Sequence, residues 1–568
     1  MGMVRRRTFA LGAIAALFVF IAAYANSLDN AFHFDDSHVV EQNIFIRDLA
    51  NIPRIFSDGR AFSSLPQNSV YRPIVTLTMA MDYRVAGGLD PTAFHVTQLA
   101  LFALVGIALI ILYRKVFERA APDPSRVWVA LIAATLFCVH TANTQVGNYI
   151  SARSESLAAL GVLGGFLMYI HGGVHARRWH LYLLPVVVGT LAKNHAIVFA
   201  PLLLVYKLLI EEQLTGADLF SREHRQRVMS ALRSSLPAFA IVIAAFLFVE
   251  RMAPPGQNYG GGNRGLYLAT EAWVWVRYVG MYFLPVKLSA DTDLSPFPAA
   301  NAQTLAGILL LLGSLGIAWK MSRTATGRPI AFGILWFWIA IAPTSSIMPL
   351  AEVTNDHRPF LAFAGLNAAV LWAAWLGLRR LGAGYPLGHV NTIGLALAVL
   401  VIAVHAVSTY QRNKVWRTSE SLWADVTRKS PGNGRALMNY GLVFMRRGDL
   451  DEARRMFLRA RERLPNYSVL ETNLGVVEAA LGNPTTAEPH FTRAIALDAS
   501  QPSPHYFYAR FLVAQGRAPE AIPQLQQSIS LSPASIDARH LLMALYAATD
   551  QQPELGALIG ETLLVASS

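Results

Sequence analysis

Two adjacent carboxylates, Asp35 and Asp36, stand in the stretch AFHFDDSHVVEQN, a few residues after an apolar run of membrane-spanning length. Aromatic side chains and two histidines flank them. In a general-base reaction one carboxylate takes a proton from an attacking hydroxyl group, and a second can hold the acceptor or orient the first. We therefore identify Asp35 and Asp36 as the candidate catalytic residues.

Further ionisable residues fall in segments that we expect at the same membrane face as the aspartates. They are Arg72, His140, Arg153, Glu155, Lys193, His195, Glu352, Asp356, His357 and Arg358. A single residue of this kind can merely mark a helix end at the headgroup level, but charges at membrane depth are costly unless they are paired or line a polar cavity. Because Arg binds phosphate with a fork of N–H groups and Lys adds a point charge, the set favours a lipid-linked phosphate as ligand.

A sugar carried on such a phosphate would already have a good leaving group. Stabilising the charge on the phosphate then matters more than protonating it. One carboxylate suffices as the base for an acceptor hydroxyl that attacks the anomeric carbon. Glycoside hydrolases differ, because their alcohol leaving group requires both an acid and a base.

The elements that must position these residues are membrane-spanning helices. The chain has 568 residues, of which 54% are apolar and 15% charged, which is too apolar for a soluble protein of this length. We predict an all-α chain with about eleven spans and a first external loop at 26–94. The predicted spans are 8–25, 95–117, 127–145, 153–171, 179–192, 195–210, 236–252, 302–320, 330–348, 360–380 and 390–409.

Basic residues between the spans predict the orientation of the chain. The N-terminus is expected inside and the C-terminus outside, because the following residues would then face the cytoplasm: Arg5–Arg7, Arg114, Lys115, Arg119, Arg177, Arg178, Arg222, Arg225, Arg227, Lys320, Arg323, Arg328, Arg379 and Arg380. The net charge of +12 thus reflects membrane orientation, and we predict no nucleic-acid partner.

Two segments leave alternatives open. Residues 1–25 also fit a cleaved signal peptide, which would put residue 30 on the same side of the membrane. The stretch Leu266–Leu288 is long enough to span but contains Glu271 and Arg277, so we favour an interfacial or re-entrant helix. The single cysteine, Cys138, excludes an intramolecular disulfide.

The tail is periodic. Gly441, Gly475 and Ala509 are spaced by 34 residues, as are Ala453, Ala487 and Ala521. Small residues, an aromatic residue and a proline at these offsets are typical of the tetratricopeptide repeat, in which two helices pack closely and stack into an α-solenoid. We predict repeats at 434–467, 468–501 and 502–535 with a degenerate fourth, and assign 1–410 to the membrane module, 411–433 to a linker or half-repeat helix and 434–568 to the repeats.

The order of motifs also resembles a known family. The chain contains, in this order, FHFDDSHVVEQN, YRPIVTLTM, HTANTQVGNYISARSE, LAKNHAIVFAPLLLVYKLL, FLPVKLSADTDL, APTSSIMPLAEVTNDHRPF and the repeat tail. This order resembles that of the transmembrane-and-tetratricopeptide O-mannosyltransferases and their bacterial relatives, members of the GT-C superfamily. The resemblance implies a polyprenyl-phosphate sugar donor, inversion at the anomeric carbon, and Asp35 as the base in preference to Asp36. It also implies donor-phosphate binding by Arg72, Arg153, Lys193 and Arg358, to which we add His195 and His357. Asn194 stands where the family has a carboxylate, which leaves the specificity open.

These observations predict an inverting glycosyltransferase of a bacterial inner membrane, with its repeats in the periplasm. Its acceptors would be Ser and Thr hydroxyls of exported proteins, engaged through the repeat domain. The alternatives are a GT-C enzyme with a lipid or glycan acceptor, a non-catalytic scaffold for envelope assembly, and a transporter. We expect no required cofactor, although Asp35, Asp36 and His38, or Asp291 and Asp293, form two alternative sets that could ligate a divalent ion.

Overall fold

Helices make up the regular structure of this protein. The computed structural model describes residues 3–567 apart from 66–67, 255–262, 298–300, 346–349, 351 and 534, and this part of the chain contains no strand. The side chains of Arg5 and Arg6, and part of the motif APTSSIMPLAEV, lie outside the described residues. The chain divides into a membrane unit, Met1–Ala290 with Leu294–Thr418, and a repeat unit, Asp291–Asp293 with Ser419–Ser568. The predicted all-α class is confirmed.

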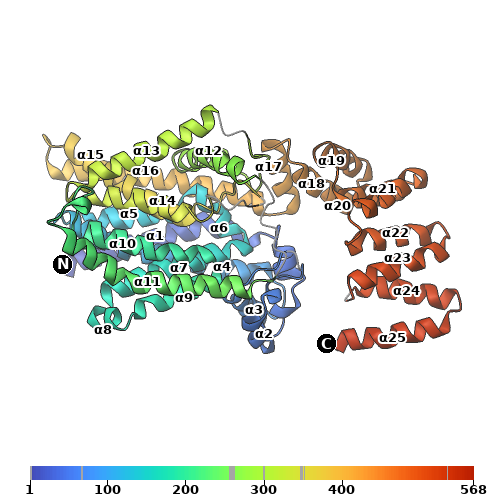
Figure 1. Cartoon of the computed structure of the whole chain (residues 1–568). Coiled ribbons are helices and arrows are strands. Elements are labelled where there is room, and N and C mark those ends of the chain that lie inside the picture. Colours follow the sequence, from blue (N-terminus) through green and yellow to red (C-terminus); the bar gives the residue numbers. More distant parts are fainter. Residues whose placement is uncertain are drawn as a thin grey trace. The chain divides into compact units, whose positions relative to one another are not determined.

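Apolar helices form the membrane unit (Figure 1). Among the described residues, seven helices are long and apolar enough to cross a membrane, or up to eight if a bent pair counts as one span. The seven are Arg7–Asp29, Pro91–Ala120, Asn194–Glu211, Arg225–Met252, Ala302–Ser322, Phe360–Leu381 and Leu387–Trp416, and the bent pair is Arg126–Val139 with Thr141–Asn148. Each of the eleven predicted spans overlaps helical structure, although 330–348 extends past the end of α14 at Ile341 and partly outside the described residues. The number of helices that crosses the membrane stays a prediction.

The main helices of this unit follow one another in chain order. They are α1 (Met3–Tyr24), α4 (Pro91–Ala120), α5 (Arg126–Val139), α6 (Thr144–Asn148), α7 (Arg153–His171), α8 (Gly173–Arg178), α9 (Leu184–Ala192), α10 (Phe199–Tyr206), α11 (Arg225–Met252), α12 (Arg264–Phe283), α13 (Ala302–Ser322), α14 (Arg328–Ile341), α15 (Phe360–Leu381) and α16 (Leu387–Asn413). Helix α12 contains most of the stretch Leu266–Leu288, whose membrane crossing the sequence leaves open, and it is not among the seven apolar helices. Thr304 of α13 donates a hydrogen bond to the Ala269 carbonyl of α12 at 3.1 Å.

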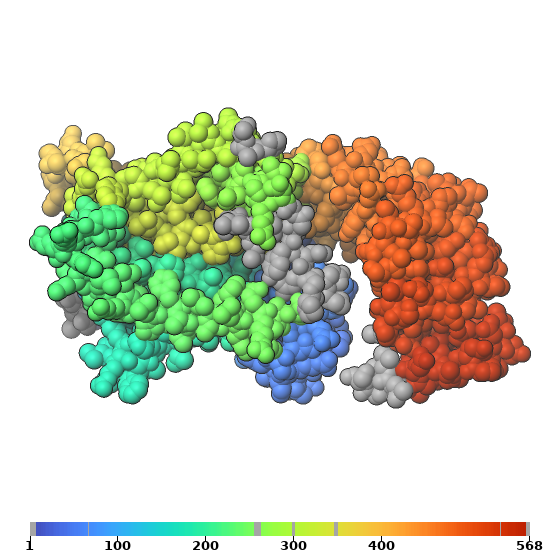
Figure 2. Space-filling model, viewed as in Figure 1, coloured from blue at the N-terminus to red at the C-terminus, as the bar shows by residue number. Residues whose placement is uncertain are grey.

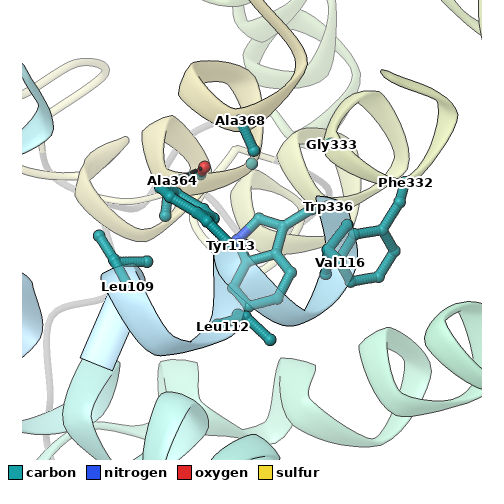
Figure 3. A pocket seen from close by; sticks show the side chains of 10 residues that line it. Leu109, Leu112, Tyr113, Val116, Phe332, Gly333, Trp336, Ala364 and Ala368 are labelled. Atoms are coloured by element: carbon teal, nitrogen blue, oxygen red, sulfur yellow. Dashed lines mark hydrogen bonds between the residues drawn. The ribbon is translucent and has the colours of Figure 1, made fainter. Parts of the chain in front are cut away.

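Small residues allow close helix contacts in the core of this unit. A Cβ atom on Gly333 of α14 would collide with the Gly365 carbonyl of α15, which is how small residues bring helices together in membranes. Beside this contact, α4 contributes Tyr113, whose hydroxyl donates to the Ala364 carbonyl at 2.6 Å (Figure 3). The apolar gap enclosed there measures about 10 Å³, so it holds no more than a water molecule.

Charged side chains gather at one end of the membrane unit. Arg379 lies 2.7 Å from Asp123, and Arg227 lies 3.0 Å from Glu212. Arg328 donates to the Gln213 carbonyl at 2.7 Å. We call this the basic end. It brings together residues that the charge pattern predicts on the cytoplasmic side.

The opposite end carries the first loop, residues 25–90, which has its own small helices α2 (Ile52–Ser57) and α3 (Pro73–Ala86). Val39, Val40, Ile55, Val75 and Met79 form an apolar core within it, each at most 2% exposed. A chain of amides fixes the loop to the helices. Asn30 donates to Asn148 at 2.6 Å, and Asn148 donates to Asn413 at the end of α16 at 2.8 Å.

The repeat unit consists of helix pairs with a constant period. After α17 (Ser419–Lys429) come α18 (Gly434–Arg447) and α19 (Leu450–Arg463), α20 (Ser468–Ala480) and α21 (Pro484–Leu497), α22 (Pro502–Ala514) and α23 (Ala518–Leu531), and α24 (Ile536–Ala548) and α25 (Gln552–Ser567). The turns inside the first three pairs contain Gly448, Gly482 and Gly516, with φ of 80°, 79° and 73°, where glycine is favoured because it has no Cβ. The predicted repeats are confirmed.

Apolar side chains remain at the surface of the membrane unit. In the space-filling view α11 (green) and α13 (yellow-green) lie at the surface (Figure 2). Leu236 and Leu247 of α11 and Leu309 and Leu312 of α13 are each 60% exposed. Such faces suit contact with lipid tails rather than water.

Candidate functional site

A strained turn presents the two aspartates. Phe34, just before them, has φ of 53°, a left-handed conformation that is uncommon for a bulky residue and is found mainly where surrounding structure enforces it. The Phe34 ring contacts Tyr149 and Trp416, with centroid distances of 5.8 and 6.1 Å. His33 adds a contact from Nε2 to the Trp416 carbonyl at 2.5 Å. Aromatic packing against Tyr149 and against Trp416, just beyond the end of α16, therefore holds the turn.

Asp36 points into the protein. Its side chain is fully buried, and it accepts hydrogen bonds from the Ser151 amide at 2.8 Å, the Ser151 hydroxyl at 2.6 Å and the His33 amide at 3.1 Å. Burial raises the pKa of Asp36 to about 7, although these hydrogen bonds act to lower it. Asp36 thus anchors the turn to the segment before α7.

Asp35 faces the opposite way. Its side chain is 60% exposed, and its Oδ1 lies 3.4 Å from His38 Nε2. It also interacts with the hydroxyl of Tyr149, whose pKa is raised well above its usual value by burial and by the two aspartates. The other nitrogen of His38, Nδ1, lies 2.9 Å from the Ser63 hydroxyl. Asp35 is therefore the aspartate that a bound acceptor can reach.

A buried carboxylate, Glu155, gathers three of the predicted basic residues. Lys193 pairs with Glu155 Oε1, His357 Nε2 lies 3.9 Å from the same oxygen, and His195 Nδ1 lies 3.8 Å from Oε2. His357 also feels the charge of Asp35, and its pKa is lowered to about 3 by burial. At neutral pH this imidazole is uncharged, so it can offer a hydrogen bond but no positive charge.

Two arginines complete the cationic group. Arg72, at the start of α3, and Arg358, just before α15, both act electrostatically on Lys193. Arg72 lies over the Phe62 ring at 5.4 Å, and Arg358 donates to the Val353 carbonyl at 3.1 Å. We use the term cationic cluster for Arg72, Lys193 and Arg358. The structure brings it to the same end of the membrane unit as Asp35.

Arg153, which the family resemblance assigns to the donor phosphate, lies in the protein interior. It is fully buried, pairs with Asp82 at 2.5 Å and donates to the Phe94 carbonyl at 2.8 Å. Its remaining N–H groups meet Gln98 and Thr78, each at 3.3 Å. Because its donors are engaged inside the protein, this geometry favours a role in holding α3, α4 and α7 together over direct contact with a phosphate.

Asn194, which stands where the resembled family has a carboxylate, lies beside a carboxylate from another helix. Asn194 Nδ2 donates to Glu250 Oε1 of α11 at 2.7 Å. A carboxylate therefore stands beside this position, although it comes from a residue 56 positions away in the chain.

Several residues of the site were not expected from the sequence. Tyr149 and Ser151 lie within the motif HTANTQVGNYISARSE but were not singled out as site residues. Glu250 lies outside the motifs, and His38 entered only as a possible metal ligand. Among the residues that the structure describes, no group of three or more His, Cys, Asp or Glu side chains is arranged to hold a metal ion. Asp291 and Asp293 instead bind Arg435 and the Gly432 amide within the repeat unit, at 2.8 and 3.1 Å.

Comparison with known proteins agrees with the order of motifs. Family models described as tetratricopeptide repeat match residues 432–500 and 478–545. Protein O-mannosyl-transferase TMTC3 of Mus musculus is 21% identical over 519 residues, which cover 84% of this chain and 54% of that protein. The resemblance to the TMTC proteins is confirmed.

Other relatives give the same result. Tmtc3 of Drosophila melanogaster is 23% identical over 84% of this chain and 58% of its own length, and human TMTC1 is 23% identical over 80% and 55%. The chain thus spans about half the length of the curated relatives it matches. Among solved structures, MamA covers 26% of this chain at 19% identity with a TM-score of 0.24, a value too low to support an inference.

Proposed function

We propose that this protein is a membrane glycosyltransferase that moves a sugar from a polyprenyl-phosphate donor to Ser or Thr hydroxyls of proteins. The observation that supports it best is the position of Asp35, half-exposed and coupled to His357, at the end of the unit where Lys193 and two arginines meet. The names of the TMTC relatives support mannose as the sugar and protein as the acceptor.

In this proposal Asp35 is the general base. It takes the proton of the acceptor hydroxyl while the hydroxyl oxygen attacks the anomeric carbon. The bond from that carbon to the phosphate oxygen breaks, and the lipid phosphate leaves with the electron pair. Attack opposite the leaving group inverts the anomeric configuration. The products are the glycosylated protein and the polyprenyl phosphate.

The cationic cluster stabilises the departing phosphate. Two guanidinium groups and one ammonium group provide charge where the negative charge develops. His357 and His195 share Glu155 with Lys193, so they hold the lysine in position. His357, as a neutral ring, can also donate a hydrogen bond to the donor. No step of this mechanism requires a metal ion.

The repeat unit would engage the acceptor protein. Arrays of this kind bind peptides and proteins along their concave face. We place the reaction at the outer face of a bacterial inner membrane, because the basic end fits the cytoplasmic side. A lipid or glycan acceptor would leave such an array without a role in the reaction.

The test is sugar transfer by the purified full-length protein in lipid nanodiscs. The donor is polyprenyl-phosphate mannose, and the acceptors are Ser/Thr peptides or, in a separate arm, a lipid-linked glycan. Asp35→Asn should lower kcat by about 100-fold or more, since a positioned general base contributes 10²- to 10⁴-fold. The matched control is Asp48→Asn, an exposed helix cap in the same loop that Asn replaces equally well. Equal rates for wild type and Asp35→Asn would refute the proposal.

A further inference from the structure

A second polar site lies at the basic end of the membrane unit, away from the aspartates. Tyr169 follows Glu155 by 14 residues along α7, which is about 21 Å at the rise of an α-helix. Between α7, α8 and α11 there is a cavity of about 300 Å³. Its lining includes Tyr169, Arg177, Lys207, Glu211, Glu212 and Ser234. The mechanism proposed above uses none of these residues.

Lys207 is the central cation of this cavity. It is 5% exposed, and its Nζ donates to the carbonyl and the hydroxyl of Ser234 at 3.0 and 2.8 Å. It also lies 5.0 Å from the centre of the Tyr169 ring. These two hydrogen bonds use two of the three hydrogens of the ammonium group. A built, largely buried ammonium group thus faces the cavity.

The carboxylates of the cavity are neutralised by other residues. Glu211 accepts from the Tyr169 hydroxyl at 2.8 Å and lies 3.4 Å from Arg177. Glu212 lies 3.0 Å from Arg227. These paired charges cancel, so the net charge of the site comes from its other residues.

Cations remain in excess around the cavity. An open groove lined by Arg225, Met229, Ser230, Arg233 and Ser234 adjoins it and shares Ser230 and Ser234 with it. Neither of these arginines, nor Lys207, is within ion-pair distance of a carboxylate among the described residues. Three positive charges are consequently available to a negatively charged ligand.

Exposed apolar side chains lie close in the chain to residues that line the cavity: Trp179 and Leu181 flank His180, and Leu236 follows Ser234 by two positions. Trp179 is 70% exposed, Leu181 42% and Leu184 61%, and Leu236 at the start of the apolar part of α11 is 60% exposed. A cationic pocket with an apolar rim matches a molecule that carries both an anionic head and hydrocarbon chains. Basic pockets between membrane helices bind lipid headgroups in this way.

We propose that this cavity binds the headgroup of an anionic phospholipid. The phosphate contacts the Lys207 ammonium group, Arg225 and Arg233 add attraction along the groove, and the acyl chains lie against Leu181, Leu184 and Leu236. Inorganic phosphate offers the same head chemistry but has no chains for the apolar rim. This inference is independent of the sugar-transfer reaction.

The test is native mass spectrometry of the detergent-purified full chain titrated with phosphatidylglycerol, with phosphatidylcholine as the zwitterionic comparison. The exposed double variant Arg225→Gln/Arg233→Gln should weaken phosphatidylglycerol binding by about tenfold or more, since each basic residue near an anionic lipid contributes about fivefold. Lys207→Gln should weaken it similarly. Lys320→Gln, an exposed lysine at the end of α13, is the matched control and should bind as wild type does.

Three results would overturn the inference. They are equal phosphatidylglycerol binding by wild type and the double variant, equal binding of the two lipids, and displacement of the lipid by millimolar inorganic phosphate. The last result would identify a site for free phosphate. Because the readout is lipid binding, its failure would leave the proposed transfer reaction unaffected, and loss of transfer would leave this site unaffected.

Discussion

Asp35 and Asp36 are neighbours in the chain but occupy opposite environments. The strained turn at Phe34 directs one carboxylate outward, 60% exposed, and buries the other on Ser151. A base must reach its substrate, whereas a buried carboxylate with three donors is already satisfied. In our proposal Asp35 therefore reacts and Asp36 sets its position.

The buried Asp36 makes stability depend on pH. Its pKa rises from 3.8 in the unfolded chain to about 7 in the folded protein. The folded state therefore holds a proton that the unfolded state has released, and stability falls as the pH rises from about 4 to about 7. Asp36→Asn removes this loss. We expect the variant to gain stability relative to wild type between pH 5 and pH 8, as measured by thermal unfolding in detergent.

Comparing wild type with Asp36→Asn isolates the contribution of Asp36 to the pH dependence of stability. The buried His33, whose pKa burial lowers to about 4, titrates in both proteins and cancels in the difference. A stability difference between wild type and Asp36→Asn that stays constant from pH 5 to pH 8 would contradict the assignment.

His38 contacts Asp35 from within the same loop. Its Nε2 lies 3.4 Å from Asp35 and its Nδ1 lies 2.9 Å from Ser63, so the ring links the reactive carboxylate to the rest of the loop. We expect His38→Ala to lower kcat about tenfold, or about 1.4 kcal/mol of activation free energy, with the KM for the lipid donor unchanged. Steady-state kinetics at saturating acceptor measure both. A change confined to KM would place His38 in donor binding instead.

At this scale the sequence indicates residue types better than residue environments. The acid pair, Lys193 and Arg358 were predicted and lie at one end of the unit. Arg153 carries the same motif signal, yet its partner Asp82 comes from a helix 71 positions earlier. No local pattern reports a pairing over that distance, and for the same reason Ser151 could not be matched to Asp36.

Helix pairs in the repeat unit depend on small residues at fixed positions. A Cβ on Gly441 would lie 2.5 Å from the Phe457 ring, so Gly441→Ala must move a buried aromatic side chain. We expect α18 and α19 to lose about 1–2 kcal/mol of local stability. Overpacking destabilises the pair, and the higher helix propensity of alanine offsets part of that cost. Amide hydrogen exchange of the full chain measures this loss.

The control for this change is Gly556→Ala in α25. A Cβ there meets nothing within 4 Å, so only the propensity term remains and local protection should stay equal or increase. Unchanged protection of α18 and α19 in Gly441→Ala would show that the pair does not depend on this contact.

Elements with a repeated pattern are predictable to the residue, and others are not. The helices that begin the four pairs, at Gly434, Ser468, Pro502 and Ile536, keep the 34-residue period read from the sequence. The membrane helices carry only an apolarity signal. This signal locates the segments. It does not report that α14 has only 14 residues or that the helix pair beginning at Arg126 is bent by 49°.

The whole membrane unit has two chemically different ends. The basic end collects arginines from four connections, and the other end carries Asp35 with the cationic cluster. If the basic end faces the cytoplasm, a reporter that is active only outside the cytoplasm should be active when fused after residue 430. A cytoplasmic reporter fused at the same position should be silent. The reverse pattern would place the aspartates on the cytoplasmic side.

The most direct test of the account is a cryo-electron microscopy structure of the full-length protein with polyprenyl phosphate bound in a nanodisc. We predict density for the phosphate among Arg72, Lys193 and Arg358, with its lipid chain leaving between the apolar helices and the Asp35 carboxylate within about one sugar ring of the phosphate. Phosphate density elsewhere in the protein, with these three side chains and Asp35 making no contact to the lipid, would contradict the account.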